Sequence, residues 1–193
     1  MARTKEFDPD AALQAAVELF WERGYEATSM ADLTERLGLG RASLYATFGS
    51  KHELFLRSLD RYRENTDATL LTELSQPGPA LAAVRGVVRR FADEALREQR
   101  LRGCLVTNTA TELAAHDRDA ARRVRASWDY LETLTAGALT RAQAQGELGP
   151  EKEPQALARL LLTVMQGIRV VGKAGDDPRR ITDATRLALS LLD

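Results

Sequence analysis

A chain of 193 residues can form one or two compact domains with a buried core. Hydrophobic residues make up 44% of it and charged residues 28%, an ordinary balance for a globular protein, and the net charge of −1 excludes a molecule that binds nucleic acid through overall positive charge. The single cysteine, Cys104, excludes an internal disulfide, and the sequence shows neither a signal peptide nor an apolar run of ~18 residues, so we expect a cytoplasmic protein without a membrane span.

Helix start and stop signals recur along the chain, whereas strand signals are almost absent. Pro9 follows the capping residue Asp8, and Ser29 and Ser50 each precede an acidic residue at the capping-box spacing. In chain order, helices are expected over about 9–23, 30–37, 41–47, 51–74, 80–99, 104–115, 118–145, 154–172 and from 178 nearly to the C-terminus. The sequence therefore predicts an all-α fold.

The first three predicted helices are short, and a Gly-Leu-Gly turn at 38–40 separates the second from the third. This arrangement is typical of a helix-turn-helix, whose last helix lies in the major groove of DNA. The outward residues of the third helix are short or can form hydrogen bonds, which suits close contact with bases and phosphates. Residues 1–52 carry six basic and eight acidic side chains, which argues against DNA binding, but 36–51 contain three bases and no acid.

Three stretches, Gly24 to Ser29, Leu37 to Tyr45 and Phe48 to Leu54, together resemble the N-terminal signature of the TetR/AcrR family without gaps over about 55 residues. The resemblance implies a nine-helix fold, with a helix-turn-helix domain over 1–50 and a ligand-binding and dimerisation domain over 51–193. It also implies that seven residues contact DNA: Thr28, Arg41, Ala42, Ser43, Tyr45, Thr47 and Lys51.

Two positions depart from the family pattern. Gly40 stands where a serine or threonine cap is usual, and Ala46 with Thr47 replaces a larger Tyr-His pair. Packing is the competing interpretation for Tyr45, and an ordinary solvated lysine is the competing interpretation for Lys51.

The last two predicted helices are apolar over more than one face, so each must bury two sides. The resemblance implies that they form a four-helix dimer interface, although a fully buried helix of a monomer would show the same pattern. The residues expected at this interface are Leu160, Val164, Ile168, Ile181, Ala184, Ala188 and Leu191.

A ligand cavity is implied among the middle helices. Its candidate residues are Tyr62, Phe91, Cys104, Asn108, Glu112, Trp128 and Met165, each of which could instead belong to the core or the surface. We expect few charges in the cavity, and hence a mainly apolar or aromatic ligand with one polar group bound by Asn108 or Glu112. Cys104 is either a reactive thiol or, as packing favours, a structural residue.

No catalytic, cofactor or metal motif is apparent, and His52 and His116 lack the neighbours of a zinc site. The leading hypothesis is a ligand-responsive transcriptional repressor that binds a palindromic operator on double-stranded DNA as a homodimer and is released by a small-molecule effector. The alternatives are a helical ligand-binding dimer that does not bind DNA and a cofactor-free enzyme that uses Glu112.

Overall fold

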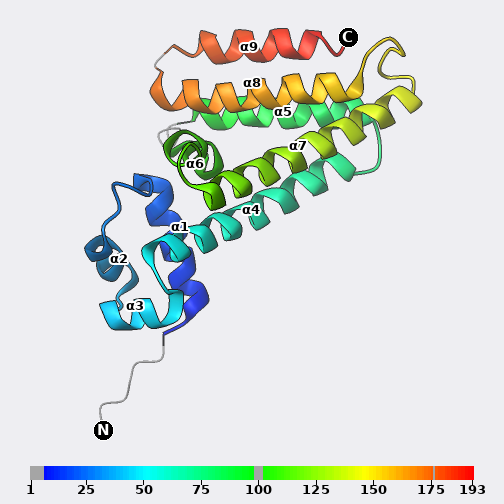
Figure 1. The fold of residues 1–193 in the computed structure, drawn as a ribbon. Helices are drawn as coiled ribbons and strands as arrows, with labels where there is room; N and C mark the ends of the chain where they lie inside the picture. Colours follow the sequence, from blue (N-terminus) through cyan, green and yellow to red (C-terminus); the bar gives the residue numbers. More distant parts are fainter. Residues whose placement is uncertain (1–6, 98–101, 176) are drawn as a thin grey trace.

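The computed structural model describes residues 7–97, 102–175 and 177–193. Over these ranges the chain forms nine helices and no strand, as predicted (Figure 1). The helices are α1 (Pro9–Arg23), α2 (Met30–Leu37), α3 (Arg41–Phe48), α4 (Lys51–Ser75), α5 (Ala80–Leu96), α6 (Leu105–Glu112), α7 (Arg118–Ala144), α8 (Pro154–Ala174) and α9 (Arg179–Ser190).

The predicted caps set most helix starts. The Asp8 carboxylate accepts the N–H of Asp10 before α1, and Ser29 and Asp32 form a complete capping box at α2. Ser50 accepts the N–H of Glu53 at 3.0 Å, but the reciprocal bond of the predicted second box is absent because the N–H of Ser50 donates to the Phe48 carbonyl at 3.1 Å.

One helix end differs from the prediction, and another predicted end falls where the structure is not described. α6 ends at Glu112 instead of Ala115, because the chain turns over 113–116 to bring Asp117 to the start of α7. The predicted end of the fifth helix, near Gln99, lies outside the described residues. Among the described helices, none is both long and apolar enough to cross a membrane.

The two larger hydrophobic cores lie at opposite ends of the molecule, and a smaller cluster joins Ala92 and Ala95 of α5 to Ile168 of α8 and Ile181 of α9. The first joins α1, α2 and α3 to the near ends of α4, α6 and α7, with Phe20, Leu44 and Phe55 among its buried residues. The second packs the far ends of α4 and α7 against α5, α8 and α9 (Figure 1). The first core includes residues on both sides of the predicted boundary at 50/51, so the three-helix head is packed firmly onto α4.

Candidate functional site

Helix α3 lies at the end of the molecule far from α9, next to α2 (Figure 1). Leu44 and Phe48 anchor it in the first core, which leaves Arg41, Ala42 and Tyr45 exposed. Tyr45 is 43% exposed, so packing within this chain does not account for its ring. The geometry fits a recognition helix that presents one guanidinium, one phenol and one small side chain to a partner.

The turn before α3 depends on glycine. Gly38 ends α2 in the left-handed region at φ 65°, which glycine adopts without strain, and Gly40 caps α3 without any side-chain hydrogen bond. Ser43 and Thr47 are partly buried on the same helix. The cap of α3 therefore carries no side chain that would hold the backbone at the start of the helix away from a groove.

Lys51 is the first residue of α4, where unpaired backbone N–H groups and the helix dipole favour a phosphate. Its ammonium lies 4.2 Å from the centroid of the Tyr25 ring. The cation–π contact holds Lys51 beside the loop between α1 and α2, in the same head as α3.

Thr28 does not fit its predicted role. Its side chain is 0% exposed, and its hydroxyl donates to the Gly24 carbonyl at 2.6 Å. In this structure Thr28 stabilises the loop between α1 and α2, and its side chain is not available to DNA.

Glu112, a predicted cavity residue, lies instead at the junction between the head and the rest of the molecule. Its carboxylate accepts the backbone N–H of Tyr25 at 3.1 Å and that of Glu26 at 2.8 Å. Gly24 has φ 84°, which favours glycine, and a Cβ at this position would lie 2.9 Å from a Glu112 oxygen. Both the backbone conformation and the close contact with Glu112 therefore favour glycine at this position. Both oxygens are bound to backbone N–H groups and Glu112 does not line the cavity described below, which removes the candidate residue of the enzyme hypothesis.

A second contact ties α4 to α7 at the same junction. His52 Nε2 lies 2.6 Å from the carboxylate of Asp117, which also accepts the N–H groups of Asp119 and Ala120 as the cap of α7. Burial would raise the pKa of Asp117, but the Ala120 N–H, His52 and the Asp119 N–H together hold that pKa below its usual value.

A cavity of about 490 Å³ lies between α1, α4, α5, α8 and the Arg102–Gly103 segment. Trp21 and Tyr62 form an aromatic wall, with ring centroids 5.1 Å apart, and Asn65, Thr66 and Thr69 add polar groups from α4. Its charged lining residues are Glu18, Arg90, Glu94, Arg97, Arg102 and Arg169. The expectation of few charges was therefore wrong, because the arginines come from separate segments and converge only in the folded chain.

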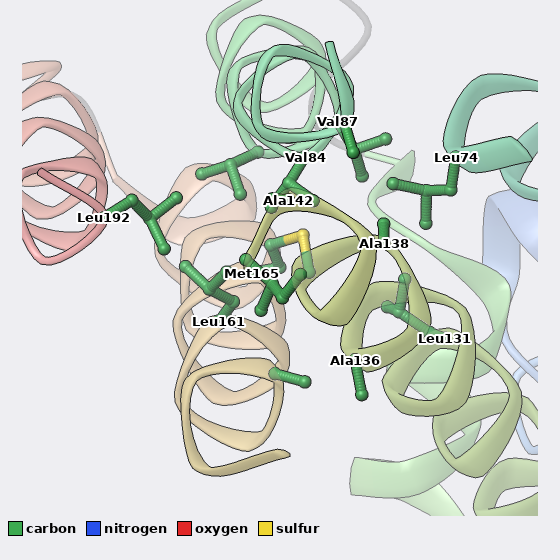
Figure 2. Close-up of a cluster of buried hydrophobic side chains, with 14 of the residues drawn as sticks. Leu74, Val84, Val87, Leu131, Ala136, Ala138, Ala142, Leu161, Met165 and Leu192 are labelled. Carbon is green, nitrogen blue, oxygen red and sulfur yellow. The ribbon is translucent and has the colours of Figure 1, made fainter. Parts of the chain in front are cut away.

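Of the seven predicted cavity residues, only Tyr62 lines this cavity. Phe91 and Met165 are buried in the second core, where Figure 2 shows Met165 close to Leu161 and Ala142. Trp128 packs against the first core. These side chains have the size and apolarity of core residues, and none of the three lines the cavity.

Asn108 and Cys104 lie behind the cavity wall. The Asn108 amide donates to the Arg102 carbonyl at 2.9 Å and accepts from Lys173 at 3.1 Å, so it braces the segment that forms the rim. Burial alone would raise the pKa of the Cys104 thiol, but the charge of Arg169 and hydrogen bonds with Thr107 and Tyr62 outweigh it and lower the pKa. The thiol is buried, as packing predicts.

The predicted interface residues divide into two groups. Leu160 and Leu191 are exposed and Val164 and Ala184 are partly buried, whereas Ile168, Ile181 and Ala188 are buried within the same chain. The last three were expected at an interface but pack against α5 and the second core. Val170, Val171 and Leu187, which are not among the residues expected at the interface, are exposed as well.

The sequence matches two family descriptions that together span most of the chain. Residues 12–57 match "Bacterial regulatory proteins, tetR family", and residues 80–188 match "Tetracyclin repressor-like, C-terminal domain". These segments correspond to the helix-turn-helix head and to the helices that follow α4.

Similar proteins are transcriptional regulators. The chain is 36% identical to the uncharacterized HTH-type transcriptional regulator YezE of Bacillus subtilis (strain 168), with both chains covered completely. It is 33% identical to the HTH-type transcriptional repressor ComR of Escherichia coli (strain K12), over 98% of this chain and 90% of that one.

A similar solved structure holds DNA. It is a cysteine mutant of the TetR family transcriptional regulator CifR in complex with 26-bp double-strand operator DNA, 29% identical, with a TM-score of 0.86 and complete coverage of both chains. The helix-turn-helix head, the two family matches and these relatives agree, and the chain belongs to the TetR family of DNA-binding transcriptional regulators.

Proposed function

We propose that this protein is a ligand-responsive repressor that binds an inverted-repeat operator as a homodimer. The observation that carries the proposal is a cavity whose wall is shared between a helix of the DNA-binding head, α1, and the helices of the body. A molecule in that cavity touches the element that positions α3, and DNA affinity then depends on whether the cavity is filled.

Arg41, Ala42 and Tyr45 support the DNA-binding part of the proposal. They share the exposed side of α3, where an arginine can pair with guanine edges and a phenol can reach a phosphate. Thr47, Ser43 and Lys51 flank this side in the roles that the family resemblance gives them. Because such a protein acts on DNA, we expect it to work in the bacterial cytoplasm.

Apolar side chains left open on α8 and α9 support the dimer. Leu160, Val171, Leu187 and Leu191 are exposed in the single chain, although large exposed apolar patches are rare on monomers. Two copies that pair these faces about a twofold axis would bury them and would set two α3 helices side by side. Such a dimer reads successive major grooves about 34–36 Å apart, or somewhat more.

Release follows from where the cavity lies. Gln14, Val17, Glu18 and Trp21 of α1 line it together with residues of α4, the helix that begins at Lys51. A ligand that separates α1 from α4 at the cavity would tilt the head and change the distance between the two α3 helices. To free a well-occupied operator, the ligand must favour the wider state by several kcal/mol.

The test is a footprint on the DNA upstream of the protein's own gene. We expect the dimer to protect two symmetric half-sites. We expect Arg41→Ala to weaken DNA binding by about 1–3 kcal/mol and to relax the base preference at one position of each half-site. Arg186→Ala, at an exposed arginine of α9, serves as the control. If the wild-type protein binds no upstream segment more tightly than other DNA, the result would instead support the alternative of a ligand-binding dimer that does not bind DNA.

A further inference from the structure

We propose that the cavity between α1, α4, α5 and α8 binds a small aromatic carboxylic acid, whose carboxylate is held by Arg169. The inference rests on the proposed function, because it names the chemical class of the effector. It replaces the neutral, mainly apolar ligand that the sequence favoured.

Arg169 is the lining residue that points to an anion. Its side chain is only 11% exposed, and its guanidinium carbon lies 3.9 Å from the centroid of the Phe91 ring. Among the described residues, its nearest carboxylate oxygen belongs to Glu94 at 3.6 Å, and it makes no hydrogen bond. A guanidinium carries five N–H donors, and the described residues accept none of those of Arg169, so a carboxylate in the cavity could accept two of them.

The neighbouring acids are already engaged. Glu94 accepts a hydrogen bond of 2.7 Å from Arg90, which also donates to Glu73 at 2.8 Å. Arg102, which also lines the cavity, is bound by Glu18 at 3.0 Å and by Glu22. Arg90 and Arg102 therefore have their partners within the protein, whereas Arg169 shares an acid that another arginine holds more closely.

The aromatic wall fits the rest of the proposed ligand. Trp21 and Tyr62 meet edge to face, and Trp21 Nε1 donates to the Gly103 carbonyl at 2.9 Å, which satisfies its polar atom and leaves an apolar ring surface. Val17 and Ala95 line the same space. A cavity of about 490 Å³ lies within the range that small ligands occupy.

One negative charge fits better than several. Glu18 and Glu94 also line the cavity and would repel a phosphate or a dicarboxylate more strongly than a monocarboxylate. A flat ring that bears a single carboxylate matches both the aromatic wall and Arg169, the lining arginine that is mostly buried and makes no hydrogen bond with the described residues.

The experiment is calorimetric titration of the full-length protein, without DNA, with benzoate, phenylacetate and trans-cinnamate, each paired with its neutral amide. We expect at least one acid to bind, and its amide to bind at least about tenfold more weakly, since a charge-assisted hydrogen bond is lost. This comparison uses the wild-type protein only, so it does not depend on any variant folding.

Variants then locate the carboxylate. Arg169→Gln should weaken binding of the acid by about tenfold or more, Arg169→Lys should weaken it less because the charge remains, and Arg122→Gln, at an exposed arginine of α7, should leave it unchanged. The proposal is overturned if no acid binds, if acid and amide bind equally, or if folded Arg169→Gln binds the acid as the wild type does. Failure of the proposed function is distinct, because it appears as a wild-type protein that does not select its upstream DNA.

Discussion

Glu112 shows how one side chain couples the head to the body. It crosses from the end of α6 to the loop after α1, where it satisfies two backbone N–H groups that the turn leaves without a helical partner. Its contribution to the fold depends on both charge and reach, and alanine provides neither.

We expect Glu112→Ala to lower the free energy of unfolding by about 1–2 kcal/mol, because it removes two hydrogen bonds to a charged acceptor at a partly exposed site. Urea unfolding measures the change. Glu64→Ala is the matched control, since its exposed pair with Arg61 at 3.6 Å is of a kind that contributes little. Equal losses in the two variants would show that the Glu112 bonds do not stabilise the junction.

Lys51 gives a prediction about the part of DNA binding that does not depend on the base sequence. If its ammonium neutralises one phosphate per subunit, Lys51→Ala should weaken binding to all duplexes and should reduce the slope of log affinity against log salt by about 0.9 for each lysine. Fluorescence anisotropy over a salt series measures both effects. Lys152→Ala, at a lysine whose ammonium donates to the Leu191 carbonyl, is the control. An unchanged slope for Lys51→Ala would mean that Lys51 does not contact phosphate.

At the scale of helices, the sequence predicted the starts well because they depend on local chemistry. Asp8, Ser29 and Asp117 each cap the helix that follows, and an N-cap acts within four residues of the chain. The outward side of α3 was predicted in part, because its residues lie on one short helix: Arg41, Ala42 and Tyr45 are exposed, whereas Ser43 and Thr47 are partly buried.

The cavity and the exposed apolar faces of α8 and α9 could not be predicted from local sequence. The cavity draws on α1, α4, α5, α8 and the Arg102–Gly103 segment, and only the folded chain brings Arg169 near Trp21 and Tyr62. Likewise, which side of α8 stays open depends on how α5 packs against it, with Gly172 close to Ala95. Periodicity shows that a helix buries two sides but does not say which partner covers each.

The start of α7 yields a prediction for pH. The pKa of Asp117 is below its usual value in the folded chain, so its ionised form stabilises the fold at pH above the unfolded value of about 3.9. That contribution is lost as the pH falls through the lowered, folded pKa. Asp117→Asn keeps a capping side chain but removes the charge, and it should therefore be less stable than the wild type at neutral pH.

Urea unfolding at a series of pH values checks this prediction. The difference between the wild type and Asp117→Asn should be largest at pH values above about 5 and should shrink on acidification. A difference that stays constant with pH would show that the Asp117 carboxylate contributes nothing through its charge.

The whole molecule depends on the pairing of two copies, because one α3 helix reads only half of an inverted repeat. We expect Leu187→Glu to give monomers in light scattering at micromolar concentration, since it places a charge in the centre of the apolar face of α9. Leu187 is 56% exposed, so the substitution should leave the fold of each copy intact.

The control is Leu71→Glu, at a leucine of α4 that is 46% exposed. It makes the same chemical change on another helix and should leave the dimer unaltered. Monomers from Leu71→Glu, or dimers from Leu187→Glu, would place the interface elsewhere than on the α8 and α9 faces.

The most direct test of the account is the affinity of the full-length protein for duplex DNA from upstream of its own gene, compared with a scrambled duplex of equal length and composition at physiological salt. We expect the upstream duplex to bind at least about 10³-fold more tightly, and we expect most of this preference to be lost when both Arg41 and Tyr45 are replaced by alanine. Equal affinity for the two duplexes, or a preference that survives the double substitution, would contradict it.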